Sequence, residues 1–109
     1  VWFGSYGPTS VTETVASWTG SAGFKTYDPR TLGLSDRAVQ DLVCLPDGRL
    51  VIVGIASGAI VWDPASGVSK TLSGLPGSRV NRLTLDTTVK PWSLLVATDG
   101  GAVVLRNIP

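Results

Sequence analysis

Short runs of apolar residues alternate with turn signals along most of this chain. In its middle third the apolar runs cover residues 39–45, 50–53 and 59–62, and a weaker run covers residues 68–72. Pro46-Asp47-Gly48 separates the first two runs, and the segment DPASG at residues 63–67 precedes the last. Proline, aspartate and glycine favour tight turns, whereas runs of this length rich in β-branched residues favour strands. The pattern predicts four short antiparallel strands in this segment.

The same pattern occurs more than once. The phrase GLSDRAVQDL begins at Gly33, and the similar phrase GLPGSRVNRL begins at Gly74. Further along, residues 51–53 match residues 94–96, and residues 58–62 match residues 101–105. A partial copy lies upstream, where residues 18–27 align with 62–71 and residues 1–4 with 51–54. Repetition at a fixed period predicts an architecture of repeated structural units.

A unit of four antiparallel strands in about 40 residues has the size of one β-propeller blade. The sequence therefore predicts an all-β fold built of such blades, with an incomplete propeller in this chain. We assign strands two to four of a partial blade to residues 1–31, a complete blade to residues 32–73, and strands one to three of another partial blade to residues 74–109, all in one propeller domain.

About two and a half blades cannot close a ring, because propellers typically contain four to eight. The chain lacks methionine and opens within an apolar stretch, so we expect it to be a piece of something longer. The expected partners are the remaining blades, on another chain or fragment, or further copies of this chain. Unpaired strand edges predict contacts along residues 1–4 and 103–107 and an isolated monomer of low stability.

The matched positions also predict the core. Leu42 pairs with Leu83 in the repeat and Cys44 with Leu85, so we expect all four side chains to be buried on innermost strands. Cys44 is accordingly interpreted as a core thiol. The strand-ending Trp18 and Trp62 are expected to pack between blades; the alternative for both is a stacking platform for a sugar.

The composition excludes several classes of catalysis and binding for this chain. The net charge of +1 gives no electrostatic reason to expect nucleic acid, and no apolar run has the length of a membrane span. Histidine is absent and there is one cysteine, which removes histidine-based catalysis and an internal disulfide. No pair of carboxylates is singled out for glycoside hydrolysis, and neither aspartate-rich turn has the ligand spacing of an EF-hand. We expect no catalytic residue, no metal and no cofactor in this chain.

The segments LPDGRLVIVG, GAIVWDPASG and GLPGSRVNRL resemble the two-component-regulator propeller repeat of bacterial sensor proteins. The matching features are Gly74-Leu75, Val80-Asn81, Asp47-Gly48 and Asp63-Pro64, along nearly the whole chain. Ile55 departs from the usual threonine, and residues 5–13 are an insert. NHL-type and WD40-like repeats share the Asp-Gly hairpin. The resemblance implies a bacterial, extracytoplasmic (periplasmic or secreted) ligand-sensing or scaffold module.

Loops on one face of a propeller are the usual place for recognition. The candidate binding residues on these loops are Tyr6, Asp36, Arg37, Arg79 and Asp99. We therefore expect a non-catalytic, ligand-binding or protein-interaction segment, with a carbohydrate or small molecule as the ligand. Two alternatives stay open: a segment of a propeller enzyme of the lyase or glycosidase type, whose catalytic residues lie on other blades, and a structural assembly module.

Overall fold

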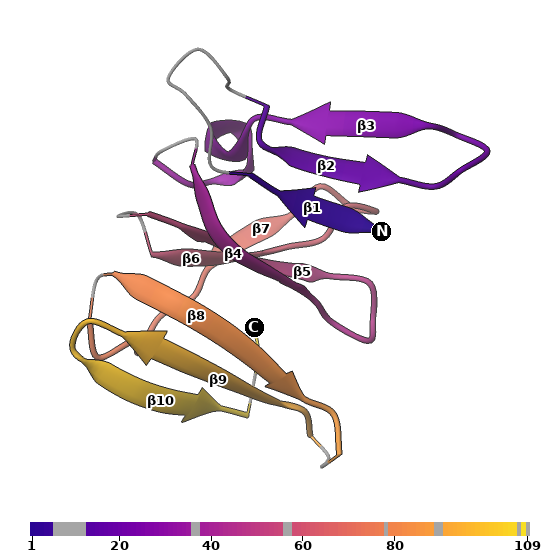
Figure 1. The fold of residues 1–109 in the computed structure, drawn as a ribbon. Helices are drawn as coiled ribbons and strands as arrows, with labels where there is room; N and C mark the ends of the chain where they lie inside the picture. Colours follow the sequence, from indigo (N-terminus) through magenta and orange to yellow (C-terminus); the bar gives the residue numbers. More distant parts are fainter. Residues whose placement is uncertain are drawn as a thin grey trace.

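The computed structural model describes residues 1–5, 13–35, 38–55, 58–77, 79–88, 91–106 and 108. They form three antiparallel sheets and contain no α-helix, so the all-β prediction is confirmed (Figure 1). The first sheet contains β1 (Trp2–Gly4), β2 (Val15–Trp18) and β3 (Phe24–Tyr27); the central sheet β4 (Val39–Cys44), β5 (Leu50–Gly54), β6 (Ala59–Trp62) and β7 (Ser69–Thr71); and the third sheet β8 (Val80–Asp86), β9 (Ser93–Thr98) and β10 (Gly101–Leu105). A short 3₁₀ helix, η1 (Pro29–Leu32), links the first sheet to the central one.

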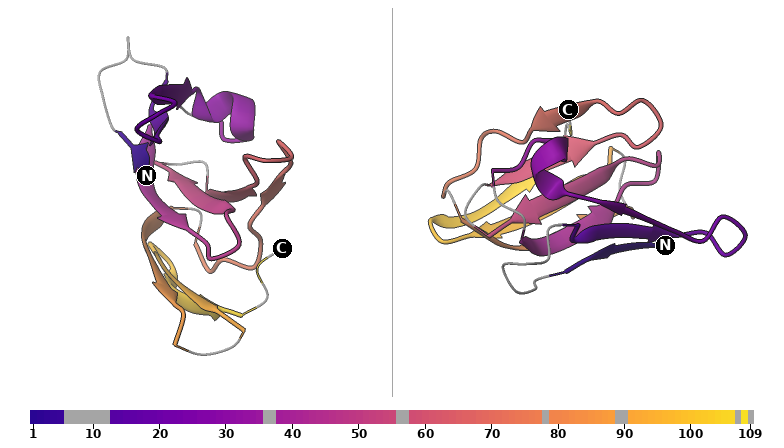
Figure 2. Two further views of the ribbon diagram at one scale, coloured as in Figure 1. Left: turned by 90° about the vertical axis from the view of Figure 1, so that its right-hand side faces the viewer. Right: turned by 90° about the horizontal axis from the view of Figure 1, so that it is seen from above.

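The central sheet lies between the other two, and its inner strands β5 and β6 are buried on both faces (Figures 1 and 2). Successive side chains of a strand point to opposite faces. Leu50, Ile52, Ile60 and Trp62 accordingly pack toward the first sheet. The alternate residues Val51, Val53, Ala59 and Val61 pack toward the third sheet. The continuous apolar runs of β5 and β6 thus belong to strands covered on both sides.

Neighbouring sheets meet along their first strands. β4 lies against β8, and β1 lies against β4 (Figure 1). The backbone N–H of Val39 donates to the carbonyl of Ser5 at 3.1 Å, and a Cβ at Gly4 would come within 2.4 Å of the Val39 side chain. The absence of a side chain at Gly4 therefore lets β1 approach β4 closely.

The central and third sheets share a detail of strand pairing. The register shifts between Val39 and Asp41 in β4, and between Val80 and Arg82 in β8. Beyond these bulges Leu42 lies opposite Ile52, and Leu83 lies opposite Val96. The expected match of Val53 with Val96 is therefore wrong by one residue. The cause is the next hairpin, because the loop closed by Gly54 and Gly58 is one residue longer than the loop closed by Thr98 and Gly101.

The predicted burial holds for one of the four matched positions and fails at Cys44. Leu83 is buried, Leu42 and Leu85 are half-buried, and the Cys44 thiol is exposed. Cys44 lies opposite Leu50, which is fully buried, so the two share a face of the sheet. Cys44 is, however, the last residue of an edge strand, where neighbouring side chains cover it on one side only. The thiol is therefore a surface group rather than part of the core.

Candidate functional site

Two of the predicted binding residues lie next to each other at the start of the third sheet. The backbone N–H of Arg79 donates to Oδ1 of Asp99 at 3.3 Å, and the backbone N–H of Asp99 donates to the carbonyl of Arg79 at 3.0 Å. Both side chains are exposed. The other three candidates, Tyr6, Asp36 and Arg37, lie outside the described residues.

Tight packing of two loops gives this end of the sheet its shape. A Cβ at Gly77 would lie 2.2 Å from Oδ1 of Asp99, and a Cβ at Gly100 would lie 2.4 Å from the carbonyl oxygen of Pro76. The Thr98 hydroxyl accepts from the N–H of Gly100 at 3.1 Å and donates to the carbonyl of Gly101 at 2.7 Å. Glycine is thus required at both contact points for steric reasons.

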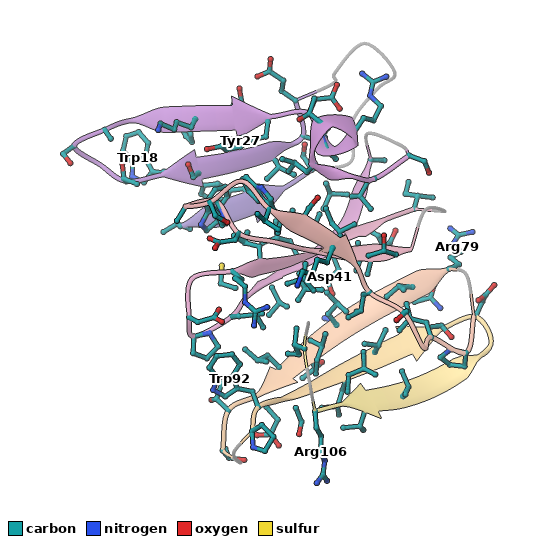
Figure 3. The ribbon with its side chains drawn as sticks, turned by 180° about the vertical axis from the view of Figure 1, so that it is seen from behind. Trp18, Tyr27, Asp41, Arg79, Trp92 and Arg106 are labelled. Carbon is teal, nitrogen blue, oxygen red and sulfur yellow. The ribbon has the colours of Figure 1, made fainter. Side chains whose placement is uncertain are left out.

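Asp99 and Arg79 differ in what their side chains are free to bind. The Asp99 carboxylate already accepts a backbone hydrogen bond and orders the loop. The Arg79 side chain extends outward at the edge of the third sheet (Figure 3). A guanidinium in this position presents its donors to solvent, where they suit a carboxylate or phosphate. Of this pair, Arg79 is the residue available for recognition.

Asp41 makes a contact that the sequence did not reveal. Its carboxylate lies in β4, half-buried, between the central and third sheets (Figure 3). Oδ1 accepts from the N–H of Leu42 and Oδ2 from the N–H of Leu83, each at 2.8 Å. A charge within a mainly apolar run was the available signal for a role inside the structure.

The aromatic side chains divide into a buried and an exposed group. Trp62 is 4% exposed and packs edge-on against Trp2 and Tyr27 of the first sheet, at centroid distances of 5.4 and 5.0 Å. Its predicted packing between sheets is confirmed. Trp18 is 42% exposed and lies on the opposite side of the first sheet, against Phe24 at 4.8 Å (Figure 3). Within the part of the chain that the structure describes no sheet covers Trp18, so its packing between blades stays a prediction.

Apolar side chains predominate on the two outward-facing sheet surfaces. We name them by the residues that strand pairing places on them. The N-terminal outer face consists of Phe3, Ala16, Trp18, Phe24 and Thr26 of the first sheet. The C-terminal outer face contains Leu95, Ala97, Ala102 and Val104 of the third sheet, together with Thr84 and Arg82 of β8. Five of these side chains are large, apolar and exposed: Phe3 (46%), Trp18 (42%), Phe24 (66%), Leu95 (40%) and Val104 (52%).

Two cavities lie near the turns at the other end of the sheets, away from Arg79. One, of about 290 Å³, is lined by Trp2, Tyr27, Lys25 and the buried Ser17, together with the turns at residues 19–23 and 64–65. The other, of about 280 Å³, lies beside Arg49, Asp63 and Lys70. Arg49 also pairs with Asp47. Desolvation acts to raise the pKa of Asp47, but hydrogen bonds from Arg49 outweigh it and hold that pKa below its ordinary value.

Among the described residues, no group of three or more histidine, cysteine, aspartate or glutamate side chains could hold a metal ion. None of the helical segments in that part of the chain is long and apolar enough to cross a membrane. No protein-family model, curated protein or solved structure matches this chain.

Proposed function

We propose that this chain is a non-catalytic interaction segment of a β-propeller, which acts by binding further sheets on its two outer faces. The observation that carries the proposal is the exposure of apolar side chains at positions whose counterparts in the central sheet are buried. The counterparts follow from strand pairing, because Leu95 lies opposite Val104 just as Val51 lies opposite Val61.

The contrast in exposure is large. Leu95 and Val104 are 40% and 52% exposed, whereas Val51 and Val61 are 0% and 3% exposed. In the same way Trp18 ends β2 as Trp62 ends β6, and their exposed fractions are 42% and 4%. A neighbouring sheet covers these positions in the central sheet. The outer sheets have apolar side chains at the matching positions, but no described sheet covers them.

Covering these faces is energetically favourable. Removing apolar surface from water contributes about 25 cal/mol per Å². Contiguous exposed apolar patches on soluble proteins commonly mark interaction sites. The carboxylates of Asp41 and Asp99 accept backbone hydrogen bonds, which gives both a structural role and supports a non-catalytic segment. Arg79, exposed at the loop end, is the group we propose for recognition of an anionic ligand.

Charge placed on one outer face tests the proposal. We expect the purified chain to self-associate, and we expect Leu95→Glu combined with Val104→Glu to weaken that association at least tenfold, because burying a carboxylate without a partner is costly. Sedimentation velocity over a range of concentrations measures the effect. The control is Val68→Glu, which charges a side chain that is 54% exposed but lies on neither outer face.

If Val68→Glu weakened self-association as much as the double variant, the added charge itself, and not its place on an outer face, would account for the effect. A wild-type chain that stays monomeric and does not bind a hydrophobic dye would refute the proposal. The relation to two-component-regulator propellers and the extracytoplasmic location stay predictions based on the sequence resemblance.

A further inference from the structure

The interface between the central and third sheets joins two unlike surfaces. The central sheet contributes small side chains, namely Val51, Val53, Ala59 and Val61. The third sheet contributes larger ones, including Leu83, Leu85 and Leu94. Toward the first sheet, by contrast, the central sheet presents large side chains, including Ile52, Ile60 and Trp62. One face of the central sheet thus has small side chains and the other has large ones.

The two outer faces repeat these classes. The C-terminal outer face has small side chains at Ala97 and Ala102, between Leu95 and Val104, with Thr84 and Arg82 of β8 along one edge. The N-terminal outer face has three aromatic side chains, and Phe24 lies 6.5 Å from Phe3 and 4.8 Å from Trp18 between ring centroids. The C-terminal outer face resembles the face that the central sheet presents to the third sheet. The N-terminal outer face resembles the face that the central sheet presents to the first sheet. Together they are the two halves of the interface already present inside the chain.

We propose that a second copy of this chain covers both outer faces, so that two copies close a ring of sheets head to tail. This inference rests on the proposed function and names its partner. The N-terminal outer face of each copy packs on the C-terminal outer face of the other. The interface between copies then continues the stacking of sheets within each copy.

The number of sheets favours two copies. Propellers typically close with four to eight blades. The described residues of each copy form three sheets, so one copy falls short of this range, two copies supply six sheets, and three copies would supply nine. Contacts between like faces fit less well. Aromatic side chains meeting aromatic side chains would overpack, and two alanine-rich faces would leave voids, whereas protein interfaces and cores pack densely.

Mixing two singly blocked variants tests the head-to-tail arrangement. One variant has Leu95→Glu with Val104→Glu, which blocks the C-terminal outer face. The other has Trp18→Glu with Phe24→Glu, which blocks the N-terminal outer face. All four side chains are already exposed, so neither variant should lose its fold, and far-UV circular dichroism checks this. Sedimentation equilibrium measures association of each variant alone and of an equimolar mixture.

We expect the wild-type chain to be a dimer, each variant alone to associate at least tenfold more weakly, and the mixture to form a one-to-one heterodimer through its one intact pair of faces. Dimers of either variant alone would show contact between like faces and overturn the inference, while leaving the proposed function intact. A mixture that stays monomeric, or a wild-type assembly larger than two copies, would also overturn it. A wild-type monomer that binds a hydrophobic dye would overturn the inference and leave the proposed function intact, whereas a monomer that binds no dye would refute the proposed function as well.

Discussion

A single carboxylate links two neighbouring sheets at Asp41. Its Oδ2 accepts from the backbone N–H of Leu83 at 2.8 Å, which is a contact between residues far apart in the chain. The bulge between Val39 and Asp41 shifts the register of β4 at this point. At the corresponding bulge of β8 stands Arg82, which is exposed on the outer side of the third sheet. Residue identity at one strand position therefore decides how that strand meets its neighbour.

Asp41→Ala should destabilise the fold by about 1–3 kcal/mol, because the N–H of Leu83 loses its acceptor in a partly buried place. Asp41→Asn keeps one carbonyl oxygen as an acceptor and should therefore lose less stability than Asp41→Ala. Urea unfolding followed by tryptophan fluorescence measures both free energies. Equal stability of Asp41→Ala and the wild-type chain would show that the bond between the sheets contributes nothing.

At the scale of elements, strand positions were predictable and loop packing was not. The alternation of apolar runs with Pro-Asp-Gly and Asp-Pro-Ala-Ser-Gly turns located β4 to β7 within a residue or two. These signals are local, since each strand and turn depends on its own residues. The approach of Gly100 to Pro76 joins loops from two different connections. No local signal in the sequence could indicate that contact.

Gly100→Ala should destabilise the third sheet by about 1–3 kcal/mol, because the added Cβ would clash with backbone rather than with a side chain that can move. Gly74→Ala is the comparison, since open space surrounds Gly74 and its φ of +80° is the main obstacle to a side chain. Hydrogen exchange of the β9 and β10 amides should rise more in Gly100→Ala. The same small rise in both variants would contradict close packing of these loops.

For the whole molecule, the central sheet lies between the other two, and each outer sheet has one face that no other described sheet covers. Apolar surface exposed on Trp18, Phe24, Leu95 and Val104 weakens the isolated chain relative to an assembly that buries it. We therefore expect stability and association to be coupled in this protein.

The midpoint of thermal unfolding should rise with protein concentration, because partners that bind only the folded state stabilise it by mass action. Differential scanning calorimetry across a hundredfold range of concentration measures this shift. The chain with Leu95→Glu and Val104→Glu should show little shift. A wild-type midpoint independent of concentration would mean that the outer faces do not contribute to stability.

The sequence by itself determined the all-β class, the positions of the central strands and the burial of Trp62, because alternation and turn chemistry act over a few residues. Only the tertiary structure decided the environment of Cys44, the contact of Asp41 and the pairing of Arg79 with Asp99. Burial at a strand position depends on whether a neighbouring sheet covers it. Cys44 and Leu50 share one face of the central sheet, yet only Leu50 lies within the core.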